Sequence, residues 1–312
     1  MTRQTTIAAD VRVSGVGLHT GRRARVTLRP APPDHGRRIG PPGGPLVPIA
    51  AERWVASRMS TSIALDDGRT ARTIEHLMAA LAAYGVDNVA IELDGPEVPI
   101  FDGSAVRWCR ALREAGVVAQ DAARRAIRLR APVQVARDGG MLRAEPCEGF
   151  AIDVTHDVLP AFPVMRWRGT VDAPTFEAGL MCARSFGNLH RRLGLTPPHA
   201  ARPPGAMPHA ADPALVEPPG VWEEIGARAG GPAPLLRGWR PWRASLVAGR
   251  RLLPPRRYPD EPGRHVALDM IGDLAVLGAP LVGRVVAHNP SHEKTFALVL
   301  AILASPEAWE IA

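Results

Sequence analysis

The sequence has few cysteines, few aromatic residues and no long apolar run. Its three cysteines, Cys109, Cys147 and Cys182, are too few and too scattered for a disulfide framework or a thiolate zinc site. No segment approaches the roughly 18 apolar residues of a membrane-spanning helix. The stretch from Met1 to Arg12 lacks the apolar core of a signal peptide. We therefore expect a cytoplasmic protein without integral membrane association.

Positive charge is carried almost entirely by arginine, since Lys294 is the only lysine among 38 basic residues. With 31 acidic residues the net charge is +7, which suits a nucleic-acid-binding protein or an enzyme with an anionic substrate. Nucleic-acid surfaces interleave basic and aromatic side chains, and aromatic residues make up only 5% of this chain. We expect no nucleic-acid partner, although an α+β nucleic-acid-binding protein remains an alternative.

Two segments show alternating strand patterns and helical patterns, and residues 117–124 between them have the composition of a linker. Each segment is predicted to be α+β. The first should contain a hairpin over 11–31, a helix from Ile74 to the stop at Gly85, a strand over 89–93 and a helix over 106–115. The second should contain strands over 127–135, 149–154 and 281–287, and helices over 265–277 and 292–304.

One long stretch shows no regular pattern. Residues 196–263 contain 15 of the 32 prolines, and no apolar period survives more than a few positions. Because proline removes a backbone donor and blocks the interior of helices and sheets, we expect an irregular segment here.

The first candidate constellation is His265, Asp269 and Asp273. At positions i, i+4 and i+8 of the predicted helix, all three side chains lie along one stripe. Two aspartates one turn apart repel each other mildly, and a histidine and an aspartate at this spacing can bind one divalent metal ion. A solvated polar face is the alternative interpretation of the same pattern.

Two further histidines have suggestive neighbours. His76 would stack over small alanine side chains on its helix, which leaves space for a metal ion, and Glu75 would point about 100° away from it. His292 begins the last predicted helix, where the helix dipole disfavours the charged imidazole. A carboxylate beside it would reverse that effect, and Asp273 is the candidate. A buried histidine with ordinary hydrogen bonds is the alternative for His76.

Several short motifs, in order along the chain, resemble the UDP-3-O-acyl-N-acetylglucosamine deacetylases, the zinc amidases of lipid A biosynthesis. Together they cover about 11–33, 54–118, 183–187 and 264–310. The motifs are Ser14-Gly15-Val16-Gly17-Leu18-His19-Thr20-Gly21, Thr73-Ile74-Glu75-His76-Leu77, Gly85-Val86-Asp87-Asn88, Pro96 to Ala105, Ala183-Arg184-Ser185-Phe186-Gly187, Arg264-His265, Leu268-Asp269, Ile271-Gly272-Asp273-Leu274 and Glu307-Ala308-Trp309-Glu310.

This resemblance implies a role for each candidate residue. It places the family's zinc ligands on His76, His265 and Asp269, which leaves a fourth position for water or substrate. It places the catalytic base on Glu75, the catalytic histidine on His292 with Asp273 as its partner, and the hydroxyl that contacts the substrate carbonyl on Ser185. The implied reaction is zinc-dependent hydrolysis of the acetamide of UDP-3-O-acyl-N-acetylglucosamine, which releases acetate.

The same resemblance implies a fold of two similar α+β domains, each a sheet layered with helices, with the active site between them. The domains are expected over 1–120, which supplies His76 and Glu75, and over 126–312, which supplies the other site residues. We expect a monomer whose partner is the UDP-linked acylated glucosamine substrate.

Three features depart from the family pattern. Val266 stands where the family has a lysine that helps to bind the nucleotide. The segment over 190–198 lacks the family's acyl-passage pattern, and the stretch before His265 is about thirty residues longer than the family requires. A degenerate, catalytically silent family member that still binds zinc or a nucleotide sugar is therefore a second alternative.

Overall fold

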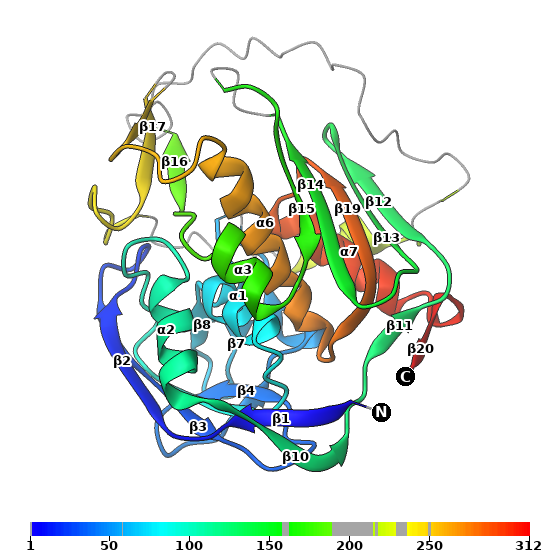
Figure 1. Cartoon of the computed structure of the whole chain (residues 1–312), viewed down its shortest axis with the longest axis horizontal. Coiled ribbons are helices and arrows are strands. Elements are labelled where there is room, and N and C mark those ends of the chain that lie inside the picture. The colour runs from blue at the N-terminus through cyan, green and yellow to red at the C-terminus, as the bar shows by residue number, and fades with distance from the viewer. Residues whose placement is uncertain are drawn as a thin grey trace.

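Two main β-sheets lie on opposite sides of a central layer of helices in the computed structural model (Figure 1). The structure describes residues 2–57, 59–157, 162–188, 215, 218–228, 236–248 and 251–312. Both segments combine helices and strands, and the predicted α+β fold class is confirmed.

The first main sheet has five strands. Its strands, in spatial order, are β2 (Val11–Val16), β3 (Arg23–Pro30), β9 (Val89–Asp94), β4 (Arg37–Gly40) and β5 (Val47–Pro48). Only the β4–β9 pair is parallel. The predicted hairpin is β2–β3, in which Val26 and Leu28 are fully buried. Two helices belong to this part of the chain, α1 (Glu75–Ala83) and α2 (Val106–Ala115).

The second main sheet has seven strands with β19 (Leu281–His288) at its centre. The others are β12 (Val133–Arg137), β13 (Gly140–Glu145), β11 (Ile127–Leu129), β20 (Trp309–Ile311), β14 (Phe150–His156) and β15 (Met165–Thr170). Helix α6 (Glu261–Leu274) packs against β14 and β15, and α7 (His292–Leu303) packs against β12 and β13. Two short 3-10 helices follow α6 and α7, η2 (Ala275–Leu277) and η3 (Pro306–Ala308).

Three smaller sheets and three short helices complete the described chain. The sheets are β1 (Arg3–Ile7) with β10 (Val117–Ala123); β6 (Trp54–Val55), β7 (Ser62–Ala64) and β8 (Thr70–Arg72); and β16 (Phe186–Asn188), β17 (Ser245–Ala248) and β18 (Arg251–Leu253). The helices are η1 (Ala51–Arg53), α3 (Ala173–Gly179) and α5 (Val221–Ala227).

One expectation from the sequence is wrong, and a second is contradicted for part of its stretch. The supposed linker over 117–124 is strand β10, which pairs with β1 more than a hundred positions earlier in the chain. The stretch over 196–263 forms α5, β17, β18 and the start of α6 where it is described. Its prolines lie outside α5, β17 and β18, and Pro262 occupies the first turn of α6, where a helix tolerates proline. Residues 189–214, including the departure over 190–198, lie outside the described residues.

The strands of the five-stranded sheet all come from residues 11–94, and those of the seven-stranded sheet from residues 127–311. The proposed division into domains over 1–120 and 126–312 stays a prediction. Within the described part of the chain, no helix has the length and apolar character that crossing a membrane requires.

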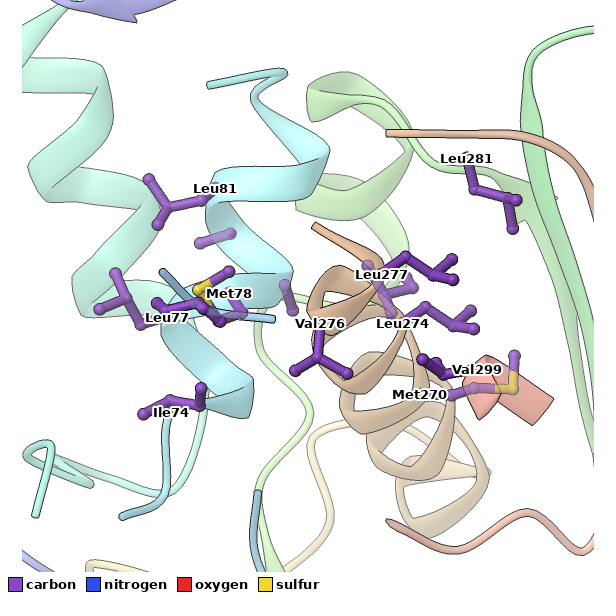
Figure 2. Packing of buried hydrophobic residues seen from close by; sticks show 14 of the residues in the cluster. Ile74, Leu77, Met78, Leu81, Met270, Leu274, Val276, Leu277, Leu281 and Val299 are labelled. Atoms are coloured by element: carbon purple, nitrogen blue, oxygen red, sulfur yellow. The ribbon is translucent and has the colours of Figure 1, made fainter. Parts of the chain in front are cut away.

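Helices α1 and α6 lie side by side at the centre of the molecule, and their buried apolar side chains include Leu77 and Met78 of α1 and Leu274 of α6 (Figure 2). They approach each other closely at Gly272, where a β-carbon would lie 2.0 Å from the carbonyl oxygen of Glu75. Only glycine fits this position without moving one helix. The helix contact therefore fixes the position of the first turn of α1 relative to the last turns of α6.

We predict that Gly272→Ala lowers the free energy of unfolding by about 1–3 kcal/mol, the usual cost of forcing a methyl group into a packed interior. Urea unfolding measures the change. Gly187→Ala is the matched control, because its β-carbon would meet nothing closer than 3.8 Å. Equal stability of the two variants would show that α1 and α6 can separate at no cost.

Candidate metal centre and its neighbours

Helices α1 and α6 bring His76, His265 and Asp269 together. One ligand atom from each residue lies within 4.8 Å of the others. The Nε2 atom of His76 is 3.4 Å from Oδ1 of Asp269, and Nε2 of His265 is 3.3 Å from Oδ2. Two ligand atoms each about 2.0–2.1 Å from a tetrahedral zinc ion are about 3.3 Å apart. The spacing of these three side chains therefore fits one metal ion.

The hydrogen-bonding state of these residues also fits a metal site. Within the described residues, Oδ1 of Asp269 is buried and has no hydrogen-bond partner. Burial alone would raise the pKa of Asp269, but His265 and His76 outweigh it and hold that pKa well below its usual range. The Nδ1 atom of His265 lies 3.1 Å from the carbonyl oxygen of Ala183, which orients the ring and leaves Nε2 toward Asp269. A carbonyl in this position is typical of histidines that bind metals.

Glu75 is the first residue of α1 and is almost completely buried. Its Oε2 atom accepts a hydrogen bond of 2.9 Å from the backbone N–H of Thr61. Burial raises the pKa of Glu75 to about 7, against the opposing effect of His292 and His76. A carboxyl with such a pKa can exchange a proton near neutrality, as a general base must.

His292 begins α7, and its Nδ1 atom is 2.8 Å from Oδ2 and 3.1 Å from Oδ1 of Asp273. Burial alone would lower the pKa of His292, but the Asp273 carboxylate raises it to about 10. The imidazole is therefore protonated at neutral pH. The structure brings together the pair that the sequence analysis expected, in spite of the unfavourable helix dipole.

Ser185 lies at the edge of this group, in the segment between α3 and β16. Its N–H donates to the carbonyl of Gly103 at 2.6 Å, and its carbonyl accepts from the N–H of Ser245 at 2.8 Å. The ring of the next residue, Phe186, packs edge-on against His265 with a centroid distance of 6.1 Å. The backbone of Ser185 is thus fixed between two residues that contact His265, Ala183 and Phe186.

Comparison with known proteins gives a consistent result. The model of the family described as UDP-3-O-acyl N-acetylglycosamine deacetylase matches residues 4–196 and 235–304. A protein named UDP-3-O-acyl-N-acetylglucosamine deacetylase from Phenylobacterium zucineum is 36% identical to this chain, covering 99% of the chain and 96% of that protein. A protein of the same name from Neisseria gonorrhoeae is 34% identical, covering 98% of the chain and 92% of that protein. This chain belongs to the UDP-3-O-acyl-N-acetylglucosamine deacetylase family.

The deacetylase family model leaves residues 197–234 unmatched. This interval lies within the proline-rich stretch, and its described part includes α5, which packs against α7. All the candidate site residues lie in the matched ranges.

Two features around this candidate site were missed in the sequence. Thr61 contacts both Glu75 and Asp273, and it lies in a short connection that none of the quoted motifs includes. Arg184 and Glu261 form a buried ion pair at 2.7 Å, and their side chains are only 6% and 1% exposed. Arg184 stood within a recognised motif, but nothing in the sequence indicated its partner 77 positions later.

The Arg184–Glu261 pair joins the Ser185 segment to the first turn of α6. The Glu261 carboxylate also accepts hydrogen bonds from the N–H groups of Arg184 and Arg257. Burial would raise the pKa of Glu261, but Arg184 and these N–H donors together lower it below the usual 4.5. Since the pKa is depressed in the folded state, the ionised carboxylate stabilises the protein above about pH 4.5, and this stabilisation is lost as the pH falls.

We predict that Glu261→Gln lowers the free energy of unfolding at pH 7 by about 3–5 kcal/mol, because Arg184 is left buried without its partner. The loss of stability between about pH 5 and pH 3 should also be shallower than in the parent protein. Urea unfolding at pH 7 measures the first effect, and urea unfolding at pH 5 and pH 3 measures the second. Asp121→Asn is the control, because Asp121 is 97% exposed in its ion pair with Arg3. Identical pH slopes for the parent and Glu261→Gln would contradict this role of the pair.

Proposed function

We propose that this chain hydrolyses the acetamide of UDP-3-O-acyl-N-acetylglucosamine and releases acetate, a step of lipid A biosynthesis. The observation that carries the proposal is the convergence of His76, His265 and Asp269 on one point, with Glu75 and His292 beside them. Family membership and the names of the relatives support the substrate and the reaction.

We propose zinc as the metal ion, held by the two imidazoles and the carboxylate of Asp269. Two histidines and one carboxylate are a common ligand set of catalytic zinc sites, and the measured spacings fit it. A bound zinc ion would polarise the amide carbonyl and lower the pKa of water toward neutrality.

The neighbouring side chains would divide the proton transfers between them. Glu75 would accept a proton from the attacking water, because its pKa of about 7 suits a general base. His292, kept protonated by Asp273, would stabilise the developing oxyanion and donate a proton to the leaving amine. Ser185 would add a hydrogen bond to the same oxygen.

Substrate binding is the property in which this chain departs from the family pattern. Val266 follows the ligand candidate His265 on α6, is half-buried and packs against the apolar core. This position therefore offers no cation to the diphosphate of the substrate. The many arginines of the chain are compatible with an anionic substrate.

The purified chain should contain zinc in equal molar amount and release acetate from UDP-3-O-acyl-N-acetylglucosamine. His265→Ala should lose zinc on dialysis and lose acetate release, because it removes one ligand. Metal analysis and an acetate assay measure both effects. His35→Ala should keep its zinc, since His35 is not among the metal-ligand candidates and its ring bonds to the neighbouring carbonyl of Gly36. Equal zinc loss in both variants would contradict the ligand set, and a zinc-loaded parent without acetate release would favour the catalytically silent alternative.

A further inference from the structure

Thr61 is the connection between the two groups to which proton transfer is assigned above. It lies just before β7 and is 1% exposed, and two of its three polar groups bond to site residues. Its N–H donates to Oε2 of Glu75 at 2.9 Å, its hydroxyl donates to Oδ1 of Asp273 at 2.5 Å, and its carbonyl accepts from the N–H of Ile74 at 3.2 Å.

The hydroxyl of Thr61 fixes the orientation of the Asp273 carboxylate. Asp273 is itself buried, and its carboxylate also lies against His292, whose Nδ1 faces both carboxylate oxygens. A hydrogen bond to an ionised carboxylate is among the stronger ones in proteins. Because threonine is β-branched, its hydroxyl has few orientations and is held toward Asp273 before any substrate binds.

We infer that Thr61 is a positioning residue that holds Glu75 and the Asp273–His292 pair in a fixed position relative to each other. Glu75 comes from α1 and His292 from α7, so no single element of secondary structure fixes their relative position. Thr61 does so through three hydrogen bonds from one buried residue. The inference rests on the proposed function for the roles of Glu75 and His292, but the contacts of Thr61 do not depend on it.

Thr61→Val removes the hydroxyl, retains the shape of the side chain and leaves both backbone contacts. We expect kcat to fall by about ten- to hundredfold, the effect of losing a hydrogen bond to a charged group. KM and zinc content should stay within about twofold of the parent values, because Thr61 reaches the reacting groups only through Asp273. Thr61→Ser keeps the donor and should retain at least about a third of the parent kcat.

Thr6→Val is the matched control, because it also removes a buried hydroxyl, one that bonds the backbone at Asn88 and Ala31. It should leave kcat unchanged. In a double-mutant cycle, Thr61→Val should cause little further loss when Asp273→Asn is already present, whereas a purely structural role would give additive losses.

A spectroscopic readout separates this inference from the proposed function. The Nδ1 proton of His292, observed by NMR in the zinc-loaded protein without substrate, should shift in Thr61→Val and stay unchanged in Thr6→Val. If the parent released no acetate, the deacetylase proposal would fail, and this proton shift would still decide the role of Thr61. An unshifted proton in Thr61→Val, or additive losses in the cycle, would overturn the inference. Should Thr61→Val not fold, a Thr61→Ser variant as slow as Asp273→Asn would overturn it too.

Discussion

The close approach of α1 and α6 at Gly272 determines the geometry of the whole site. The α-carbon of Gly272 lies one turn beyond Asp269 and next to Asp273, while the carbonyl oxygen that it faces belongs to Glu75, beside His76. The short separation of His76 and Asp269 follows from this contact between helices, because each side chain is short and begins at a fixed backbone. A larger residue at 272 would move one proposed ligand away from the other two.

The second constraint is the cost of burying charge. Glu75, Asp273, His265 and His76 are all nearly inaccessible to water, and buried charges are stable only when they are paired or bound to a metal ion. The chain meets this requirement with polar partners from distant segments: Thr61 for Glu75 and Asp273, and Ala183 for His265. Burial raises the pKa of Glu75 to about 7, and pairing with Asp273 raises the pKa of His292 to about 10. A base and an acid can therefore coexist in one site near neutral pH.

The elements with a clear periodic pattern of apolar residues could be predicted from the sequence, and so could the candidate site residues that lie on them. The pattern of Ile74, Leu77, Met78 and Leu81 predicts α1, and the i, i+4, i+8 spacing of α6 places His265, Asp269 and Asp273 on one face. Strand β10 could not be predicted in this way, because its alternation is weak and its partner β1 is far away in the sequence. The contact of Thr61 with Asp273 spans 212 positions and has no local signal. Such contacts are determined by the packing of helices and not by any pattern along the chain.

The central claim is that α1 and α6 each contribute to one metal centre. X-ray absorption at the zinc edge tests it most directly in the parent protein and in His76→Ala, the variant being reloaded with one equivalent of zinc before measurement. We predict a first shell of nitrogen and oxygen atoms at about 2.0–2.2 Å, with two imidazoles in the parent and one in His76→Ala, and without sulfur at about 2.3 Å. A sulfur ligand in the parent, or the same two imidazoles in both proteins, would contradict the account.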